Sequence, residues 1–374
     1  MSSNKSAILT TVVVFFLFVF QQVVDFTSNT FRLVDPYWIF IVMLVLLIGN
    51  KLHYSETRYK SAFYFMMICV GCSFLTIING SSIGECASKA FMSFMGFITF
   101  VYIDKKEIDY KTYLILYSLL YVFSYFSYFI FDEFTRRNLD PDLFGHSSSN
   151  TIAMYLNVAL WFLYVIQIES NIRKSLLLAI YSILNVYLIL LQGSRAGLLV
   201  SLILCFLIIG DFVIERFNIK AAKLKVVLYT LFSVLIVYYI SNNMNVIEEF
   251  VDVREYQGVS SYEEDARGIA MGAFFSQLNI KTVLFGMPDS TLLLGGLNRT
   301  FNAFIDFWRR FGILPFIVLI YFVYSRIKNF KQYSVPLVAL LPILFYSLFE
   351  SLWGGTLWDM LIYISLFYSK KVFK

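Results

Sequence analysis

The 374-residue chain carries little charge. Asp, Glu, Lys and Arg make up only 15% of it, whereas soluble globular domains contain about 25%. Hydrophobic residues reach 59% and the mean hydropathy is +0.71. This composition excludes an ordinary soluble domain. The net charge of +5 arises from basic residues scattered through short loops, so it does not indicate a nucleic-acid partner.

Residue types that build redox or metal sites are also scarce, with four cysteines and two histidines. Cys69 and Cys72 form a C-x-x-C motif, but it lies inside an apolar run with no second Cys or His pair nearby. We interpret both as small apolar helix residues, and Cys86 has no evident partner. The outer loops lack a His/Cys cluster and a glycine-rich phosphate loop. We therefore expect no metal and no nucleotide cofactor.

Long apolar runs recur from end to end of the chain, each about 17–22 residues and long enough to cross a bilayer as a helix. A transmembrane barrel would instead need short alternating segments. The sequence predicts an all-α polytopic membrane protein with about 12 transmembrane helices, the first of them uncleaved. The expected spans are residues 7–24, 37–50, 62–79, 88–103, 112–131, 150–168, 175–191, 196–214, 226–241, 303–324, 334–350 and 355–369.

The loops between these spans differ in charge from one side to the other. Nineteen of the 30 Lys and Arg residues fall on the side of the two termini, whereas 18 of the 25 Asp and Glu residues fall on the opposite side. Cytoplasmic loops are enriched in Lys and Arg, so both termini are expected in the cytoplasm.

One extracytoplasmic loop, residues 242–302, is far longer than the others. Residues 259–278 within it predict an amphipathic helix, with Arg267 and acidic residues on one face and Ile269, Phe274 and Phe275 on the other. We treat residues 1–374 as a single membrane domain that includes this loop.

Arg195 is the first candidate functional residue. It lies in Gln192-Gly193-Ser194-Arg195-Ala196-Gly197, in a tight connection between two spans on the extracytoplasmic side. A snorkelling interfacial arginine would explain it, but such anchors accumulate mainly on the cytoplasmic side. Gly193 and Gly197 form a small-xxx-small pair, which indicates close helix packing. A guanidinium binds phosphate in a bidentate manner, so Arg195 is a candidate for a lipid-linked phosphate.

Further candidates share that side of the membrane. Arg267 follows three acidic residues, so a solvated ion-paired face is the alternative to a role in charge stabilisation. His146 is a candidate general base, although it precedes a Ser-Ser-Ser-Asn run that is also a helix N-cap signal. The carboxylates of Asp289, Asp306 and Glu350 are alternative bases, and the sequence does not rank them.

Four segments in order resemble the O-antigen ligase and O-antigen polymerase (Wzy-type) superfamily. They are residues 144–157, which contain Asn150; residues 191–198, with the Gly-Ser-Arg-Ala-Gly-Leu element; Arg267 through Gly286; and Asn302 through Gly312. Ligases of this family usually have His before the last Asn, and Phe301 stands there instead. This departure favours the polymerase branch.

The resemblance implies a GT-C-like membrane glycosyltransferase that is metal-independent. It would transfer a growing glycan from undecaprenyl pyrophosphate to a lipid-linked repeat unit at the periplasmic face of the bacterial inner membrane. Arg195, Arg267 and His146 would then be catalytic, and Asn150, Arg299, Asn302 and Arg309 would bind substrate. A chain-length regulator and a flippase of the same pathway are the implied protein partners.

Three alternatives remain open. A ligase would move the finished glycan onto lipid A-core. A lipid-linked oligosaccharide flippase or other transporter would also suit twelve spans, but transporters tend to have inverted repeats and charged or broken helices at mid-membrane. A non-catalytic assembly partner of the polysaccharide machinery is the third.

Overall fold

The computed structural model describes residues 2–15, 57–106, 108–131, 149–169, 175–192, 194–217, 266–288, 302–329, 337–349 and 360–367. Every regular element within these ranges is helical, as the sequence predicts. Among the described residues, two stretches are long and apolar enough to cross a membrane, Tyr59–Asn79 and Ala196–Arg216, and the helices over Ala153–Ile168 and Leu176–Leu190 are apolar but shorter.

The helices follow one another along the chain as α1 (Ser2–Phe15), α4 (Thr57–Leu75), the 3-10 turn η2 (Thr76–Asn79), α5 (Ile83–Lys106), α6 (Tyr110–Phe131), α7 (Ser149–Glu169), α8 (Leu176–Gln192), α9 (Arg195–Arg216), α12 (Ala266–Ser276), α13 (Ile280–Phe285), α14 (Ala303–Phe311), α15 (Ile313–Lys328), α16 (Leu337–Phe349) and α17 (Met360–Phe367). Most coincide with expected spans. The spans expected at 37–50 and 226–241 lie outside the described residues.

One expected span is wrong. Residues 303–324 form two helices, α14 and part of α15, instead of a single helix. Gly312 separates them, because its φ of 80° lies in the left-handed region that a continuing helix cannot use. Its amide donates to the carbonyl of Trp308 and so ends α14. The polar residues of α14 therefore belong to a separate short helix.

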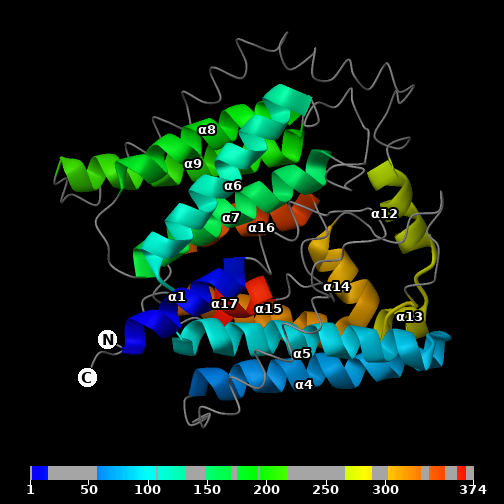
Figure 1. Cartoon of the computed structure of the whole chain (residues 1–374). Coiled ribbons are helices and arrows are strands. Elements are labelled where there is room, and N and C mark those ends of the chain that lie inside the picture. The colour runs from blue at the N-terminus through cyan, green and yellow to red at the C-terminus, as the bar shows by residue number, and fades with distance from the viewer. Residues whose placement is uncertain are drawn as a thin grey trace.

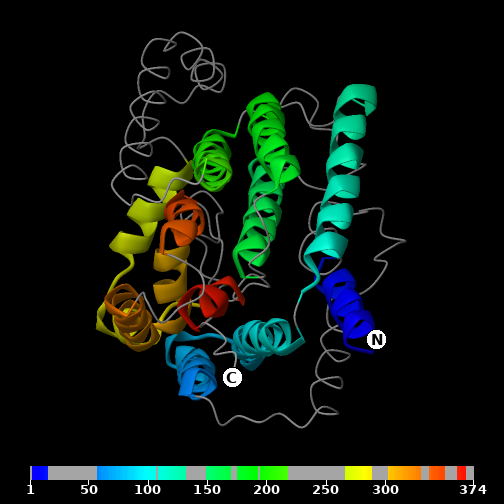
Figure 2. The same cartoon turned by 90° about the vertical axis from the view of Figure 1, so that its left-hand side faces the viewer.

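The helices form two groups, which are connected by α1, through its contacts with α5 and α6, and by the pair α14 and α16, which reaches α4 on one side and α7 and α9 on the other. In Figure 1, α4 and α5 lie side by side along the lower edge, and α6, α7, α8 and α9 lie above them. The short helices α12, α13 and α14 lie at the side opposite α1, and we call this side the loop end. Figure 2 shows α12, α14 and α16 grouped on one side of the bundle and α6 on the other.

Aromatic side chains hold together helices that are distant in the sequence. Phe65 of α4 stacks on Phe307 of α14, with ring centroids 6.1 Å apart. The same ring meets Phe322 of α15 and Tyr363 of α17 edge-on, both at 5.8 Å. Such offset and edge-to-face contacts add to the free energy of burying the rings. The loop end is thereby anchored to the long helices.

Candidate functional site

The start of α9 contains the Gly-Ser-Arg-Ala-Gly element. Ser194 is the N-cap, and its hydroxyl accepts a hydrogen bond from the amide of Gly197 over 3.2 Å. This cap satisfies one of the amides that a helix start leaves open, which is why the chain begins a helix at Arg195. The backbone of Arg195 is therefore the first turn of α9, and its side chain lies outside the described part of the structure.

The first turn of α9 packs closely against α7. A Cβ placed on Gly197 would lie 2.8 Å from the Cβ of Ala153, so only glycine permits this approach. The side-chain amide of Asn157 on α7 donates to the carbonyl of Gly197 over 2.8 Å. The close packing that the glycine spacing predicts is confirmed for Gly197, whereas Gly193 lies outside the described residues. The first two segments of the resemblance thus touch each other.

A buried polar network extends from this contact into α8. The Asn185 amide donates to the Asn157 carbonyl oxygen and to the Ser201 hydroxyl, both over 2.9 Å. All three side chains are fully buried. Sequence reasoning missed the network, because its members come from three helices. The signal that was available is an asparagine in the middle of each of two apolar runs.

The second half of the candidate site is built from α12, α13 and α14. Arg267 is the second residue of α12, and its side chain is outside the described part. Phe274 of α12 is buried and meets the Trp308 ring of α14 at 5.6 Å. The apolar face predicted for this helix is confirmed for Phe274, but Phe275 is half exposed.

Two glycines lock the turn after α13 against the turn after α14. Gly286 and Gly312 both have positive φ, and a Cβ on either would collide with backbone atoms of the other turn. The Met287 amide donates to the Arg309 carbonyl, and the Trp308 indole N–H donates to the Val283 carbonyl over 3.2 Å. The third and fourth segments of the resemblance are therefore one packed unit.

Two of the predicted substrate-binding residues are used within this unit. The Asn302 side chain caps α14 by accepting from the amides of Phe304 and Ile305, and its Nδ2 donates to the carbonyl of Leu348 at the end of α16. Arg309 is buried, and its Nε lies 3.4 Å from Oδ1 of the buried Asp306 on the same helix. Asp306, a candidate base in the sequence, thus has an arginine partner.

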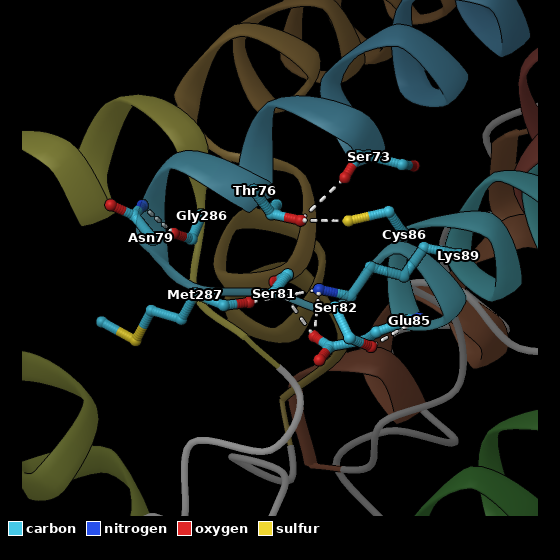
Figure 3. Close-up of polar contacts among 10 residues, drawn as sticks. All are labelled: Ser73, Thr76, Asn79, Ser81, Ser82, Glu85, Cys86, Lys89, Gly286 and Met287. Atoms are coloured by element: carbon cyan, nitrogen blue, oxygen red, sulfur yellow. Dashed lines mark hydrogen bonds and ion pairs between the residues drawn. The ribbon is translucent and has the colours of Figure 1, made fainter.

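A cluster of polar contacts ties this unit to the α4–α5 hairpin (Figure 3). The Asn79 amide donates to the carbonyls of Lys281 and Gly286, over 3.0 and 2.6 Å. The buried Lys89 ammonium lies 3.0 Å from the Glu85 carboxylate and donates to the Met287 carbonyl over 3.2 Å. We call Asn79, Glu85 and Lys89 the clamp. Sequence analysis did not single them out, although Lys89 is a cation within an expected span.

The remaining predictions lie mostly outside the described residues. These are His146, Arg299, Asp289 and Glu350, and the side chain of Asn150, whose backbone belongs to the first turn of α7. All four cysteines are buried and free, as expected for apolar helix residues. Within the described ranges, no three His, Cys, Asp or Glu side chains gather as a metal site requires.

Comparisons with known proteins identify no relative of this chain. No family model, no curated protein and no solved structure matches this chain. The function is therefore argued from the residues and their geometry.

Proposed function

We propose that this protein is a surface-polysaccharide polymerase of the O-antigen polymerase type. The observation that carries the proposal is the construction of the α9 start. Ser194 caps it, Gly197 packs it against α7 and Asn157 donates to its backbone, so the backbone that carries Arg195 is held in place. An arginine in the first turn of a helix suits a phosphate or pyrophosphate group, because the guanidinium and the helix N-terminus both attract anions.

The packing of α12, α13 and α14 supports the same proposal. Arg267 belongs to a helix that is fixed by Phe274 and Trp308 and, through α13, by the clamp. Helix α16 contacts both α14 and α9, so it connects the unit that contains Arg267 with the helix that contains Arg195. Two arginines on one scaffold can serve two lipid-linked pyrophosphates, one on the donor and one on the acceptor.

The reaction needs orientation and charge stabilisation more than acid catalysis. A sugar hydroxyl of the acceptor repeat attacks the anomeric carbon of the donor glycan, and the bond from that carbon to the pyrophosphate oxygen breaks. Undecaprenyl pyrophosphate departs with the bonding electrons, and its negative charge is stabilised by Arg195 and Arg267. The hydroxyl proton passes to a base, for which we propose His146. Holding both lipids in register supplies much of the rate.

We also propose a cellular location and a membrane topology for the protein. Both termini are in the cytoplasm, the loop end faces the periplasm, and the membrane is the bacterial inner membrane. A chain-length regulator and a flippase would work beside the enzyme. Asn150 and Arg299 are proposed to bind the glycan from the same side.

The test uses a strain that lacks the protein, complemented with wild type, Arg195→Ala, Arg195→Lys or Arg267→Ala at matched membrane levels. Surface glycan is resolved on a gel. We expect both alanine variants and the empty strain to show lipid A-core capped with one repeat, with partial recovery in Arg195→Lys. The control is Arg216→Ala, which changes an exposed arginine at the other end of α9 and should keep the normal ladder.

The other outcomes separate the alternatives. Wholly uncapped core in the empty strain would point to a ligase or a flippase. A normal ladder in both alanine variants would remove the arginines from the mechanism.

A further inference from the structure

Several large apolar side chains are exposed on α13 and on the elements next to it. Ile280 is 80% exposed and Leu284 is 46% exposed, both on this short helix. Ile77 and Ile78 of η2 and Ile83 at the start of α5 are also exposed. Five exposed isoleucine and leucine side chains on adjoining elements form a patch, in contrast to the scattered single residues that need no explanation. We call these five residues the loop-end patch.

The members of the loop-end patch are held side by side by polar contacts. The Asn79 amide at the end of η2 donates to the carbonyls of Lys281 and Gly286, which lie at the two ends of α13. The Asn279 side chain and Thr282 form a capping box that starts α13 and accepts from its first backbone amides. The backbone of α13 is therefore satisfied locally, while its apolar side chains remain outside.

The patch continues the exposed face of α4. That helix and η2 together form one of the two stretches long and apolar enough to cross a membrane, and α4 exposes Tyr64, Met67 and Phe74. On the other side α13 contacts α15, which exposes Leu314 and Ile317. Helix α13 thus contacts η2, which continues α4, and also α15, and both of these long helices expose apolar side chains.

We infer that the loop-end patch is seated in the outer leaflet of the membrane, with α13 lying in the headgroup region. Ile280 and Leu284 reach toward the acyl chains, and the exposed Lys281 between them meets lipid phosphates. Because α12 directly precedes α13, this anchor fixes the height of the Arg267 helix above the bilayer. The inference rests on the proposal that α4 crosses the membrane, and it does not depend on polymerase activity.

The experiment measures the depth of single nitroxide labels on full-length protein in nanodiscs of phosphatidylethanolamine and phosphatidylglycerol. Labels are placed by Ile280→Cys and Leu284→Cys, and unlabelled background is checked with wild type, whose four cysteines are buried. Met67→Cys on the exposed face of α4 is the lipid reference, and Lys111→Cys at the start of α6 is the aqueous reference. Collision with oxygen and with a water-soluble nickel chelate is recorded at each position.

We expect the labels at 280 and 284 to collide more with oxygen than with nickel, at a depth between the two references. Labels that behave like the one at 111, while 67 reports lipid, would overturn the anchor and leave the membrane span of α4 standing. If the label at 67 also reports water, both the anchor and the membrane span of α4 are overturned. Labels at 280 and 284 shielded from both reagents would place a second copy of the chain on the patch and would equally overturn the lipid assignment.

Discussion

The backbone at Gly312 has no room for a side chain. Its φ is 80°, and a Cβ there would collide with the carbonyl of Leu284. An L-residue in the left-handed region costs about 1–2 kcal/mol, and the collision adds to it. We expect Gly312→Ala to lower the Tm of the detergent-purified protein and to reduce its folded yield. The control is Gly272→Ala on α12, where a Cβ meets nothing within 4 Å and alanine should be neutral or slightly stabilising. Equal Tm values for the two variants would contradict the interlocked turns.

The effect of replacing Asn185 on stability and on glycan length can also be predicted. Replacing it with leucine removes both of its donated hydrogen bonds and leaves Asn157 and Ser201 with one partner fewer in a buried setting. We expect a loss of about 1–2 kcal/mol in unfolding free energy, together with shorter glycan chains, because the α9 start loses its support. Ser347→Ala is the control, since the buried Ser347 hydroxyl donates to the Ile343 carbonyl within its own turn of α16. A wild-type Tm and ladder for Asn185→Leu would show that the network does not position α9.

At the residue scale, the sequence predicts a functional residue only when the residues that interact with it are close to it along the chain. Arg195 and Gly197 stand out locally, because a cation and a glycine pair interrupt two apolar runs. Asn157 and Asn185 are 28 residues apart, and each alone is an ordinary polar residue in a helix. Only the packing of α7, α8 and α9 brings the two asparagines together, so no local sequence pattern predicts the network.

At the scale of elements, the clamp decides how firmly α13 is held. Asn79→Ala removes two bonds to the α13 segment, and Lys89→Met keeps an apolar stem but loses the ammonium that meets Glu85 and the Met287 carbonyl. We expect faster amide hydrogen exchange in peptides covering residues 280–288 in both variants. Ser82→Ala is the matched control, because Ser82 accepts only from the Glu85 amide within its own turn. Unchanged exchange in Asn79→Ala would mean that the glycine interlock alone holds α13.

Helix positions were predicted well wherever an apolar run ends at polar residues, as for α6, α8 and α9. The exception is 303–324, where Asp306, Arg309 and Arg310 precede the apolar run, but the sequence does not show that a helix break separates them from it. Gly312 stops the helix there because the chain must clear Leu284 and Gly286, which lie nearby only in the folded protein. The contact of Gly312 with Leu284 and Gly286, which are distant in the sequence, thus breaks the helix that the local sequence predicts. The same break places the buried Asp306 and Arg309 on a short helix that packs against α4, α13 and α16.

At the scale of the whole molecule, orientation in the membrane decides whether the proposed chemistry is available. The positive-inside rule acts on short loops, and the loop-end side carries the minority of the Lys and Arg residues. We expect an alkaline phosphatase fusion after Gly80 to be active, since the proposed topology puts that turn in the periplasm, and a fusion after Ile108 to be inactive. A green fluorescent protein at the C-terminus should fluoresce. The reversed pattern would place Arg195 and Arg267 on the cytoplasmic side. The flipped lipid-linked repeats are on the opposite side, so the arginines could not reach them. This result would exclude the polymerase proposal even if every contact described above were correct.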